Sequence, residues 1–334
     1  MVVVTGGSGH VGANLVRMLH ERGRPVRALV HRDRRAFDGL DIETASGDIL
    51  DSRSLVSAFK GADYVYHLAV HISISKRDAA EAALINVQGT RNVVDACREG
   101  GVRRLVHFSS IHSLSSEPRD EMIDENRPLA GASATVYDRS KVDAEWIVLE
   151  AVEKGLDAII VNPTAILGPC DFKPSYMGRF LLALYHRDFK SLVTGGFDWV
   201  DVRDVIKGAL AAEQRGKRGE RYLLSGTWLS VPDLAALVEE ITGVRAPWFT
   251  APMWLAYMGL PFMGALSRMK KSEPLYTKES LHALQNHRFI SHDKATRELG
   301  YKPRPLQETL RDTLEWFDAH GYLDERSMLR RAWG

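Results

Sequence analysis

The first twelve residues constrain the fold of this 334-residue chain more than any other stretch of it. Residues 1–4 are apolar and mostly β-branched, which is typical of a buried strand, and a helical period of apolar residues begins at Ala13. A glycine-rich turn between them would bring bare backbone and the N–H groups of a helix start to the phosphates of a dinucleotide. The sequence therefore predicts a dinucleotide-binding loop, with an ordinary glycine-rich turn as the alternative. The glycines of this turn are Gly6, Gly7, Gly9 and Gly12.

Strands and helices alternate through the first half of the sequence. This alternation predicts an α/β fold of the Rossmann type, in which a doubly wound parallel sheet of about seven strands carries helices on both faces. Right-handed crossovers place the C-terminal ends of all strands at one edge, where ligands bind. The later strands are expected at 25–30, 42–45, 63–69, 102–108 and 158–161, and the helices at 13–19, 54–59, 79–98 and 144–152.

After Pro163 the alternation breaks down, and prolines and glycines separate the remaining segments. We expect residues 1–167 to form the dinucleotide-binding domain, with 191–224 returning to it. Residues 168–190 and 225–334 are expected to form a smaller, mostly helical substrate-binding lobe. Helices are expected there and in the returning segment at 176–185, 202–212, 231–241, 253–269 and 306–320.

Charge and cysteine content exclude several classes of protein. The 44 Lys and Arg residues nearly balance the 43 Asp and Glu residues, so nothing in the charge favours a nucleic-acid partner. Cys97 and Cys170 lack metal-ligand spacing, so neither a disulfide framework nor a metal site is expected. The N-terminus has no basic region before its strand, which favours a cytoplasmic protein over a secreted one. The apolar stretch 251–266 is short and interrupted by Pro and Gly, which predicts a pocket-covering helix pair rather than an integral membrane segment, with peripheral membrane contact as the alternative.

Tyr137 and Lys141 lie four residues apart in a predicted helix, so their side chains project from one face. A free tyrosine has a pKa of about 10 and exchanges protons poorly near neutrality. A nearby ammonium would lower that pKa toward the working range, and the lysine could also bond a cofactor ribose. The pair predicts an acid–base tyrosine, with a solvated helix surface as the alternative.

Ser110 follows the predicted strand 102–108. Hydroxyl groups at the C-terminal end of a parallel strand face the ligand crevice, so Ser110 could donate a hydrogen bond to a substrate carbonyl. Capping of loop backbone is the alternative for the other serines nearby. We expect the scattered histidines to be structural or exposed; they are His71, His112, His186, His282 and His287.

The residues after Val30 indicate which dinucleotide is bound. NAD-binding proteins usually place an acidic residue at the end of the second strand to accept from the ribose 2′-hydroxyl. Here the strand is followed by a basic segment, His31 to Arg35, whose guanidinium groups would suit the 2′-phosphate of NADP. NADP is therefore favoured over NAD. The alternatives are a solvated basic loop, or Asp33 serving a ribose hydroxyl if the strand runs longer.

Together these motifs resemble the extended branch of the short-chain dehydrogenase/reductase superfamily. The glycine turn after Thr5 and the Tyr137–Lys141 pair are similar to the two signatures of that branch, and further matches follow in the same order along the chain. Within the branch, residues 107–113 and 168–175 resemble dihydroflavonol-4-reductase-like proteins, relatives of 3β-hydroxysteroid dehydrogenases. The loop that chooses substrates in plant flavonoid reductases has no counterpart here. The further matches are Gly47–Asp48, His67–Ala69, Asn86–Val93, Asn162–Thr164, Gly168–Pro169 and Trp199–Val205.

The resemblance implies a role for each matched residue. Tyr137 is implied as the general acid or base, Lys141 as the group that lowers its pKa, Ser110 as the group that orients the substrate oxygen, and Asn86 as a residue that holds Lys141 or its water. The implied cofactor contacts are Gly6, Gly9, His10, Val11, Gly12, His31, Arg32, Arg35, Asp48, Ile49, Leu68, Ala69, Val70, Tyr137, Lys141, Pro163 and Thr164.

The sequence therefore favours an NAD(P)-dependent oxidoreductase that reduces a ketone or aldehyde, or oxidises the alcohol, of a small hydrophobic molecule. One alternative is a nucleotide-sugar epimerase or dehydratase that uses bound NAD, and another is a non-catalytic dinucleotide-sensing protein. The resemblance also implies a homodimer through helices 79–98 and 137–152. The hydrophobic substrate is suggested by Phe172, Tyr176, Met177, Phe180, Phe197, Trp199, Trp254, Tyr257, Met258, Phe262 and Met263, although most are expected to be core residues.

Overall fold

The computed structural model describes residues 1–72, 79–131, 134–260, 277–286 and 288–324. Three candidate residues, Phe262, Met263 and His287, lie outside these ranges, as does the second half of the helix expected at 253–269. Its first half, residues 253–260, is helical.

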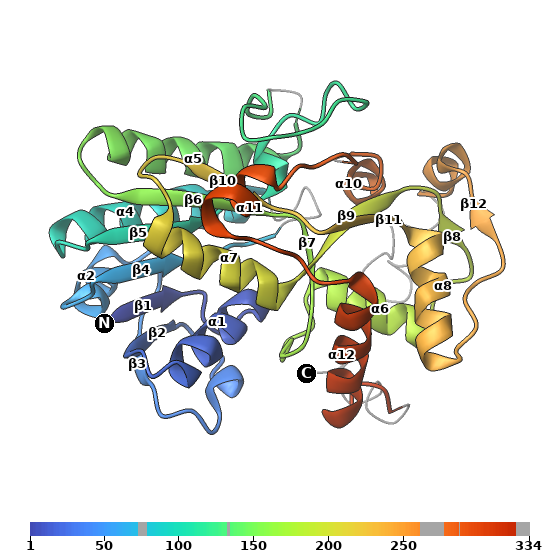
Figure 1. The fold of residues 1–334 in the computed structure, drawn as a ribbon, viewed down its shortest axis with the longest axis horizontal. Coiled ribbons are helices and arrows are strands. Elements are labelled where there is room, and N and C mark those ends of the chain that lie inside the picture. Colours follow the sequence, from blue (N-terminus) through green and yellow to red (C-terminus); the bar gives the residue numbers. More distant parts are fainter. Residues whose placement is uncertain (73–78, 132–133, 261–276, 287, 325–334) are drawn as a thin grey trace.

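A seven-stranded parallel sheet forms the centre of the larger lobe, in the order β10-β6-β5-β4-β1-β2-β3 (Figure 1). The chain winds outward from β1 in one direction and from β4 in the other, so a crevice opens between the ends of these two strands. This order confirms the predicted Rossmann fold. The strands are β1 (Val2–Thr5), β2 (Val26–Val30), β3 (Glu43–Ser46), β4 (Tyr64–His67), β5 (Arg104–Phe108), β6 (Ala158–Pro163) and β10 (Arg221–Leu224).

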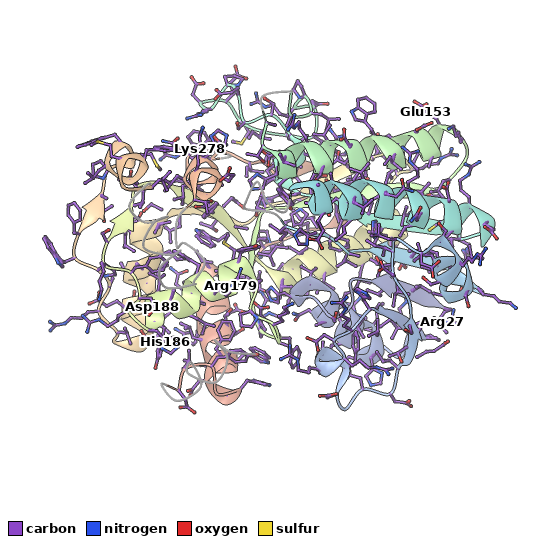
Figure 2. The ribbon with its side chains drawn as sticks, turned by 180° about the vertical axis from the view of Figure 1, so that it is seen from behind. Arg27, Glu153, Arg179, His186, Asp188 and Lys278 are labelled. Atoms are coloured by element: carbon purple, nitrogen blue, oxygen red, sulfur yellow. The ribbon has the colours of Figure 1, made fainter. Side chains whose placement is uncertain are left out.

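Helices cover both faces of the sheet because the inner strands are largely apolar on both sides. Val2 and Val4 pack on the face covered by α1 and α7, whereas Val3 packs on the opposite face. Figure 2 shows α4 and α5 side by side over that opposite face, with Glu153 marking the end of α5. The helices are α1 (His10–Glu21), α2 (Ser52–Phe59), α4 (Gly89–Glu99), α5 (Val136–Glu153) and α7 (Val202–Arg215).

The helix expected as one unit at 79–98 has three parts. A π-helical turn, η3 (Leu84–Gln88), separates α3 (Ala79–Ala83) from α4. Such a turn holds one residue more than an α-helical turn and often lies at a functional site. The turn carries Asn86, one of the predicted site residues.

The smaller lobe combines short strands with helices around its own core. A three-stranded sheet, β11-β9-β7, and a two-stranded one, β12-β8, pack with these helices around Trp199, which is fully buried. Met177, Phe180 and Phe197 pack into the same core, so these candidate pocket residues are largely structural. The elements are β7 (Ala165–Leu167), β8 (Leu192–Val193), β9 (Gly196–Asp201), β11 (Thr227–Ser230), β12 (Thr250–Ala251), α6 (Tyr176–Tyr185), α8 (Val231–Thr242), α10 (Lys278–Ala283) and α12 (Leu306–Ala319).

The chain returns to the large sheet twice after leaving it. β10 pairs with β6, and α7 packs beside α1. Helix α11 (Asp293–Leu299), expected in the smaller lobe, also packs on the large sheet, because Ala295 and Leu299 join the core that contains Val2 and Val4. The division into two lobes stays a prediction.

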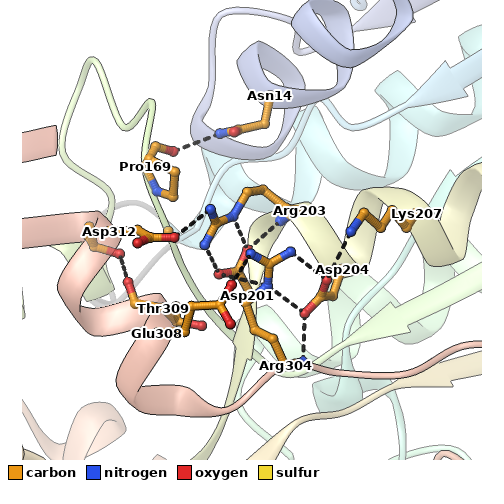
Figure 3. Close-up of polar contacts among 12 residues, drawn as sticks. Asn14, Pro169, Asp201, Arg203, Asp204, Lys207, Arg304, Glu308, Thr309 and Asp312 are labelled. Atoms are coloured by element: carbon orange, nitrogen blue, oxygen red, sulfur yellow. Dashed lines mark hydrogen bonds and ion pairs between the residues drawn. The ribbon is translucent and has the colours of Figure 1, made fainter. Parts of the chain in front are cut away.

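A cluster of ion pairs ties the lobes together (Figure 3). Asp201 caps the start of α7, and Arg203 bonds it at 2.7 Å while also pairing with Asp312 of α12 at 2.6 Å. Arg304 pairs with Asp204 at 2.8 Å and with Asp201 at 3.4 Å. The motif 199–205, one of the sequence matches, therefore fixes α7 against α12 and the segment before it.

Two kinds of feature are absent from the described part of the chain. No helix there is long and apolar enough to cross a membrane. No group of three or more His, Cys, Asp or Glu side chains there is arranged to hold a metal ion. Both cysteines are free, and Cys97 is buried.

Candidate active site

Two glycines of the turn, Gly6 and Gly12, are packed too closely for any larger residue. Gly6 has φ +70°, and a Cβ there would lie 2.5 Å from the backbone nitrogen of Ala69. A Cβ on Gly12 would lie 2.2 Å from the Gly6 carbonyl oxygen. At the helix start, no described side chain caps α1 at Gly9, which leaves first-turn N–H groups for an anion. The turn therefore fits a phosphate group.

The side chain of His10 faces the loop after β7. Its Nε2 donates to the Gly168 and Pro169 carbonyl oxygens at 3.1 and 3.2 Å, and Asn14 Nδ2 donates to the latter at 2.9 Å. Val11 packs against the core of the large lobe. These contacts hold the loop against the glycine turn, so His10 and Val11 could serve a cofactor through their backbone rather than their side chains.

The end of β2 carries the groups predicted to choose the cofactor. The strand stops at Val30, and Asp33 lies beyond it, paired with Arg35 at 2.6 Å, which lowers the pKa of Asp33. The longer strand that would have brought Asp33 to a ribose hydroxyl is therefore not formed. His31 and Arg32 are exposed, and His31 Nε2 lies 3.6 Å from Asp48 Oδ2. Arg32 is thus better placed than Arg35 for an anion.

Among the other predicted cofactor contacts, Ile49 is a core residue. Its side chain is buried, and a Cβ on Gly89 of α4 would lie 2.6 Å from it, so the helix packs directly over this side chain. Leu68 and Ala69 are partly buried at the end of β4, and Val70 is exposed. The side chain of Ile49 thus belongs to the hydrophobic core on this face of the sheet.

Pro163 and Thr164 lie at the C-terminal end of β6. Pro163 is the last residue of the strand and is buried. Thr164 Oγ1 donates to Asp198 Oδ1 at 2.7 Å, and Asp198 also accepts from the Gly226 backbone at 2.7 Å. Burial raises the pKa of Asp198 to about 6, although these two hydrogen bonds act to lower it. Asp198 therefore fixes the loop that carries Thr164.

The structure brings Ser110, Tyr137 and Lys141 together at the end of β5. Tyr137 lies in the first turn of α5, whose start is fixed by a capping box at Thr135. The Tyr137 hydroxyl is hydrogen-bonded to Ser110, and Lys141 Nζ donates to the Phe108 carbonyl oxygen at 2.9 Å. A phenol, a hydroxyl and an ammonium therefore converge at the sheet edge where the crevice opens.

The pKa values at this site run opposite to the sequence expectation. Burial raises the pKa of Tyr137 to about 12, although the bond to Ser110 opposes the shift. Burial also lowers the pKa of Lys141 to about 8, although the negative charge of Glu145 acts to raise it. The expected lowering of the tyrosine pKa by Lys141 is thus not found, because desolvation of the phenol outweighs the other interactions and the ammonium is bound to Phe108.

Asn86 acts on the neighbour of Lys141 rather than on Lys141. Its Nδ2 donates to Ser140 Oγ at 2.9 Å and to the His71 carbonyl oxygen at 3.0 Å, and its Oδ1 accepts from the His71 backbone at 2.8 Å. Ser140 Oγ in turn contacts the Tyr137 carbonyl oxygen at 2.7 Å. The amide therefore ties the loop after β4 to the start of α5, and the direct hold on Lys141 that we expected is replaced by these bonds.

A buried network beneath Ser110 was missed by the sequence analysis. Glu145 is fully buried and accepts from Ser113 Oγ at 2.6 Å, Asn162 Nδ2 at 2.7 Å and Arg221 at 2.8 Å. Asn162 Nδ2 also donates to the Ser110 carbonyl oxygen at 3.0 Å. The signal in the sequence was the position of Glu145, four residues after Lys141 on the same helix face.

His112 stands beside Tyr137. Its ring lies edge-on at 5.8 Å between centroids, and its Nδ1 is 3.2 Å from Asp138 Oδ1. This histidine was expected to be structural or exposed. In the fold it is a direct neighbour of the candidate acid–base group.

The chain is similar to known proteins over almost its whole length. A sequence profile described as "NAD dependent epimerase/dehydratase family" matches residues 2–225. Sterol demethylase protein B of Methylococcus capsulatus is 37% identical over 326 residues, which cover 96% of this chain and 99% of that protein. A Synechocystis protein named "Putative dihydroflavonol 4-reductase" is 35% identical to this chain, and the match covers 96% of this chain and 95% of that one.

A solved structure, that of gox2253, superposes with a TM-score of 0.85 at 36% identity. The match covers 96% of this chain and 99% of that one. Sequence and fold thus agree over almost the whole length. The chain belongs to the NAD dependent epimerase/dehydratase family, in the extended short-chain dehydrogenase/reductase branch, and is an NAD(P)-dependent oxidoreductase.

Proposed function

We propose that this enzyme uses NADP to reduce a ketone or aldehyde, or to oxidise the corresponding alcohol, in a small hydrophobic molecule. The observation that carries the proposal is the convergence of Ser110, Tyr137 and Lys141 at the end of β5. The sterol in the name of a 37% identical relative supports an apolar substrate.

The residues around the crevice fit a dinucleotide. The glycine turn leaves room for phosphates beside an uncapped helix start, and Arg32 offers an exposed cation for the 2′-phosphate. When bound, the nicotinamide exchanges a hydride with the substrate carbon. The groups proposed to line the rest of the cofactor site are His31, Asp48, Ala69, Val70 and Thr164.

The side chains at the end of β5 supply the proton chemistry. A pKa raised to about 12 keeps the Tyr137 phenol protonated at neutral pH, so it can donate its proton to the substrate oxygen during reduction. Ser110 donates a hydrogen bond to the same oxygen as negative charge develops on it. The Lys141 ammonium, held in the same buried site, stabilises the phenolate that remains. In the oxidative direction the same phenolate takes the proton back.

The proposal is tested by offering the purified enzyme a panel of sterol, aryl and aliphatic ketones, with NADPH and NADH compared in parallel. Consumption of NADPH with apolar ketones is the expected result. Tightly bound NAD that survives purification, together with epimerisation or dehydration of nucleotide sugars without net redox change, would assign the enzyme to the other activity of its family. Failure to turn over any substrate while still binding the cofactor would favour a sensing role.

We also infer a homodimer formed through α4 and α5, which lie side by side on one face of the molecule (Figure 2). Light scattering during size-exclusion chromatography tests this inference. A particle of twice the 37.3 kDa chain mass is expected, and a particle of the chain mass itself would contradict it.

A further inference from the structure

The three groups that meet at the end of β5 come from two separate elements. Tyr137 and Lys141 lie on α5, whereas Ser110 follows β5. The hydrogen bond between Tyr137 and Ser110 therefore depends on how firmly α5 is held against the strand ends. A displacement of about 1 Å can lower a reaction rate by about 100-fold, so a group that fixes α5 at this point affects the chemistry.

The buried carboxylate of Glu145 joins α5 to three other elements. Its Oε1 accepts from Ser113 Oγ at 2.6 Å and from Asn162 Nδ2 at 2.7 Å, and its Oε2 accepts from Arg221 at 2.8 Å. Ser113 belongs to the 3-10 turn η4 (Ile111–Ser113), Asn162 to β6 and Arg221 to β10. The helix that carries the candidate acid–base group is thus bonded to the turn that follows Ser110 and to the two neighbouring strands.

Glu145 also determines which way the Asn162 amide points. A carboxylate only accepts hydrogen bonds, so it holds the NH₂ end of this amide toward itself. The second proton of the same NH₂ group is then free to reach the Ser110 carbonyl oxygen, which lies 3.0 Å from Asn162 Nδ2. The backbone that carries the Ser110 hydroxyl is therefore held by Asn162, and Asn162 is held by Glu145.

Glu145 also carries a negative charge one helical turn from Lys141. Burial lowers the pKa of Lys141 to about 8, and the Glu145 carboxylate acts to raise it. His67 of β4 and His107 of β5 interact with Lys141 from the sheet, and burial lowers the pKa of both imidazoles, so both are neutral at pH 7. Among the described groups that interact with Lys141, Glu145 is therefore the carboxylate that favours its protonated form.

We propose that Glu145 is a positioning residue for the reaction: it fixes Ser110 relative to Tyr137, and it supplies the negative charge that balances Lys141. The inference rests on the proposed function, because it gives Glu145 a part in the acid–base step described there. Glu145 is fully buried beneath these groups and acts through them rather than on the substrate.

The variant Glu145→Gln tests the proposal, because it keeps the shape of the side chain and removes its charge. With NADPH and a ketone, kcat is expected to fall by about 10- to 100-fold, while the dissociation constant for NADPH is unchanged. The alkaline limb of the pH–rate profile, where Lys141 loses its proton, should move to lower pH by about one unit. A purely structural role would lower kcat without moving this limb.

A second variant covers the case in which Glu145→Gln fails to fold. The single change leaves the Arg221 guanidinium without its anionic partner, which is strongly destabilising in a buried pair. The double variant Glu145→Gln/Arg221→Met removes both charges, so no unpaired charge is left behind. It should fold and should show the same shift of the alkaline limb.

Glu213 provides a matched control. It is also buried, and it accepts from Arg24 at 3.0 Å and from the Tyr66 hydroxyl at 2.7 Å. It lies at the opposite end of β5 from the candidate site, because Arg104, the first residue of that strand, donates to its backbone carbonyl oxygen at 2.7 Å. Glu213→Gln should lower stability as Glu145→Gln does, but should leave kcat and the pH–rate profile unchanged.

The titration of Lys141 can also be followed without substrate or cofactor. Urea denaturation of wild type and Lys141→Met over a range of pH values shows where the folded protein loses this proton, because the stability difference between the two begins to shrink there. With Glu145→Gln present in both proteins, the shrinkage should begin about one pH unit lower.

Two results would overturn the proposal. One is a Lys141 titration that stays at the same pH in Glu145→Gln and in the double variant, by both activity and stability. The other is an equal effect of Glu213→Gln on kcat and on the alkaline limb. Failure of the proposed function looks different: Tyr137→Phe would then keep its kcat, while the stability measurement would still report whether Glu145 supports the charge of Lys141.

Discussion

The molecule has two buried clusters of ionisable groups, one at the end of β5 and one between the lobes. Burial has opposite consequences for the charged forms of the groups in these two clusters. At the lobe junction, Arg304 and its carboxylate partners are matched in charge, and the pKa of Asp201 is lowered and that of Arg304 raised, so both stay ionised. At the end of β5, burial prevails: the pKa of Lys141 falls to about 8 and that of Tyr137 rises to about 12, so the charged form of each is destabilised, although Lys141 stays mostly protonated at pH 7.

The difference separates a structural cluster from a reactive one. Matched ion pairs resist any change in protonation, which suits a junction that holds two lobes together. Groups whose charged forms are destabilised exchange protons more readily once a ligand changes their surroundings. The two clusters should therefore respond to mutation in different measurements, one in stability and the other in activity.

Tyr137→Phe should have the largest effect of all. Removing the hydroxyl deletes the proton donor, so kcat is expected to fall by about 10²–10⁴-fold while the dissociation constant for NADPH is unchanged. Steady-state kinetics and cofactor titration measure the two quantities. An unchanged kcat would remove Tyr137 from the mechanism.

Arg304→Ala should break the cluster at the lobe junction. It leaves the buried carboxylates of Asp201 and Asp204 without one partner, so the free energy of unfolding should fall by about 3–5 kcal/mol. Urea denaturation measures it. Lys207→Ala is the matched control, because Lys207 lies 3.9 Å from the same Asp204 but is mostly exposed, and its pair should contribute at most about 1 kcal/mol. Equal losses in the two variants would contradict the account.

Lys141→Met should lower the activity of the enzyme and raise its stability near neutral pH. The folded protein holds the Lys141 pKa at about 8, whereas the unfolded chain has the usual 10.5. Between these values the unfolded state binds more protons, so this residue makes wild-type stability rise with pH across that window. Below pH 8 the buried ammonium costs stability, and the variant should be more stable at pH 7 by about 3 kcal/mol.

Urea denaturation of both proteins at pH 7 and at pH 10 checks this expectation. The difference between them isolates Lys141 from the other groups that titrate in the same window. The advantage of the variant should shrink at the higher pH. A variant that is less stable than wild type at pH 7 would show that the ammonium is well compensated where it lies.

Arg32→Ala should have the smallest effect, confined to the cofactor. Arg32 is exposed, so removing it should not change stability. It should raise KM for NADPH by about tenfold and leave KM for NADH unchanged, because only NADPH carries the 2′-phosphate. Arg34→Ala is the control, because Arg34 is exposed two residues further along the same segment but donates to Thr44. An equal rise in KM for NADPH and for NADH would argue against NADP as the cofactor.

Much of the fold and part of the site could be predicted from local patterns. The glycine turn was identified by its pattern between a strand and a helix, and the structure gives the steric reason at Gly6 and Gly12. Tyr137 and Lys141 were identified because helical spacing places them on one face. The strand that closes the sheet, β10, was placed only within the segment 191–224. Its pairing with β6 depends on contacts between distant parts of the chain.

The sequence by itself determined the Rossmann sheet and the opening turn, since these follow from short-range periodicity and from the parallel arrangement of strands. The meeting of Ser110 with Tyr137 was expected only from the resemblance to the short-chain dehydrogenase/reductase superfamily. Tertiary structure alone decided the protonation of Tyr137 and Lys141, the bonds of Asn86 and the network around Glu145. Each of these depends on how much water the rest of the chain excludes from a group and on which distant groups reach it, and no local pattern records either quantity.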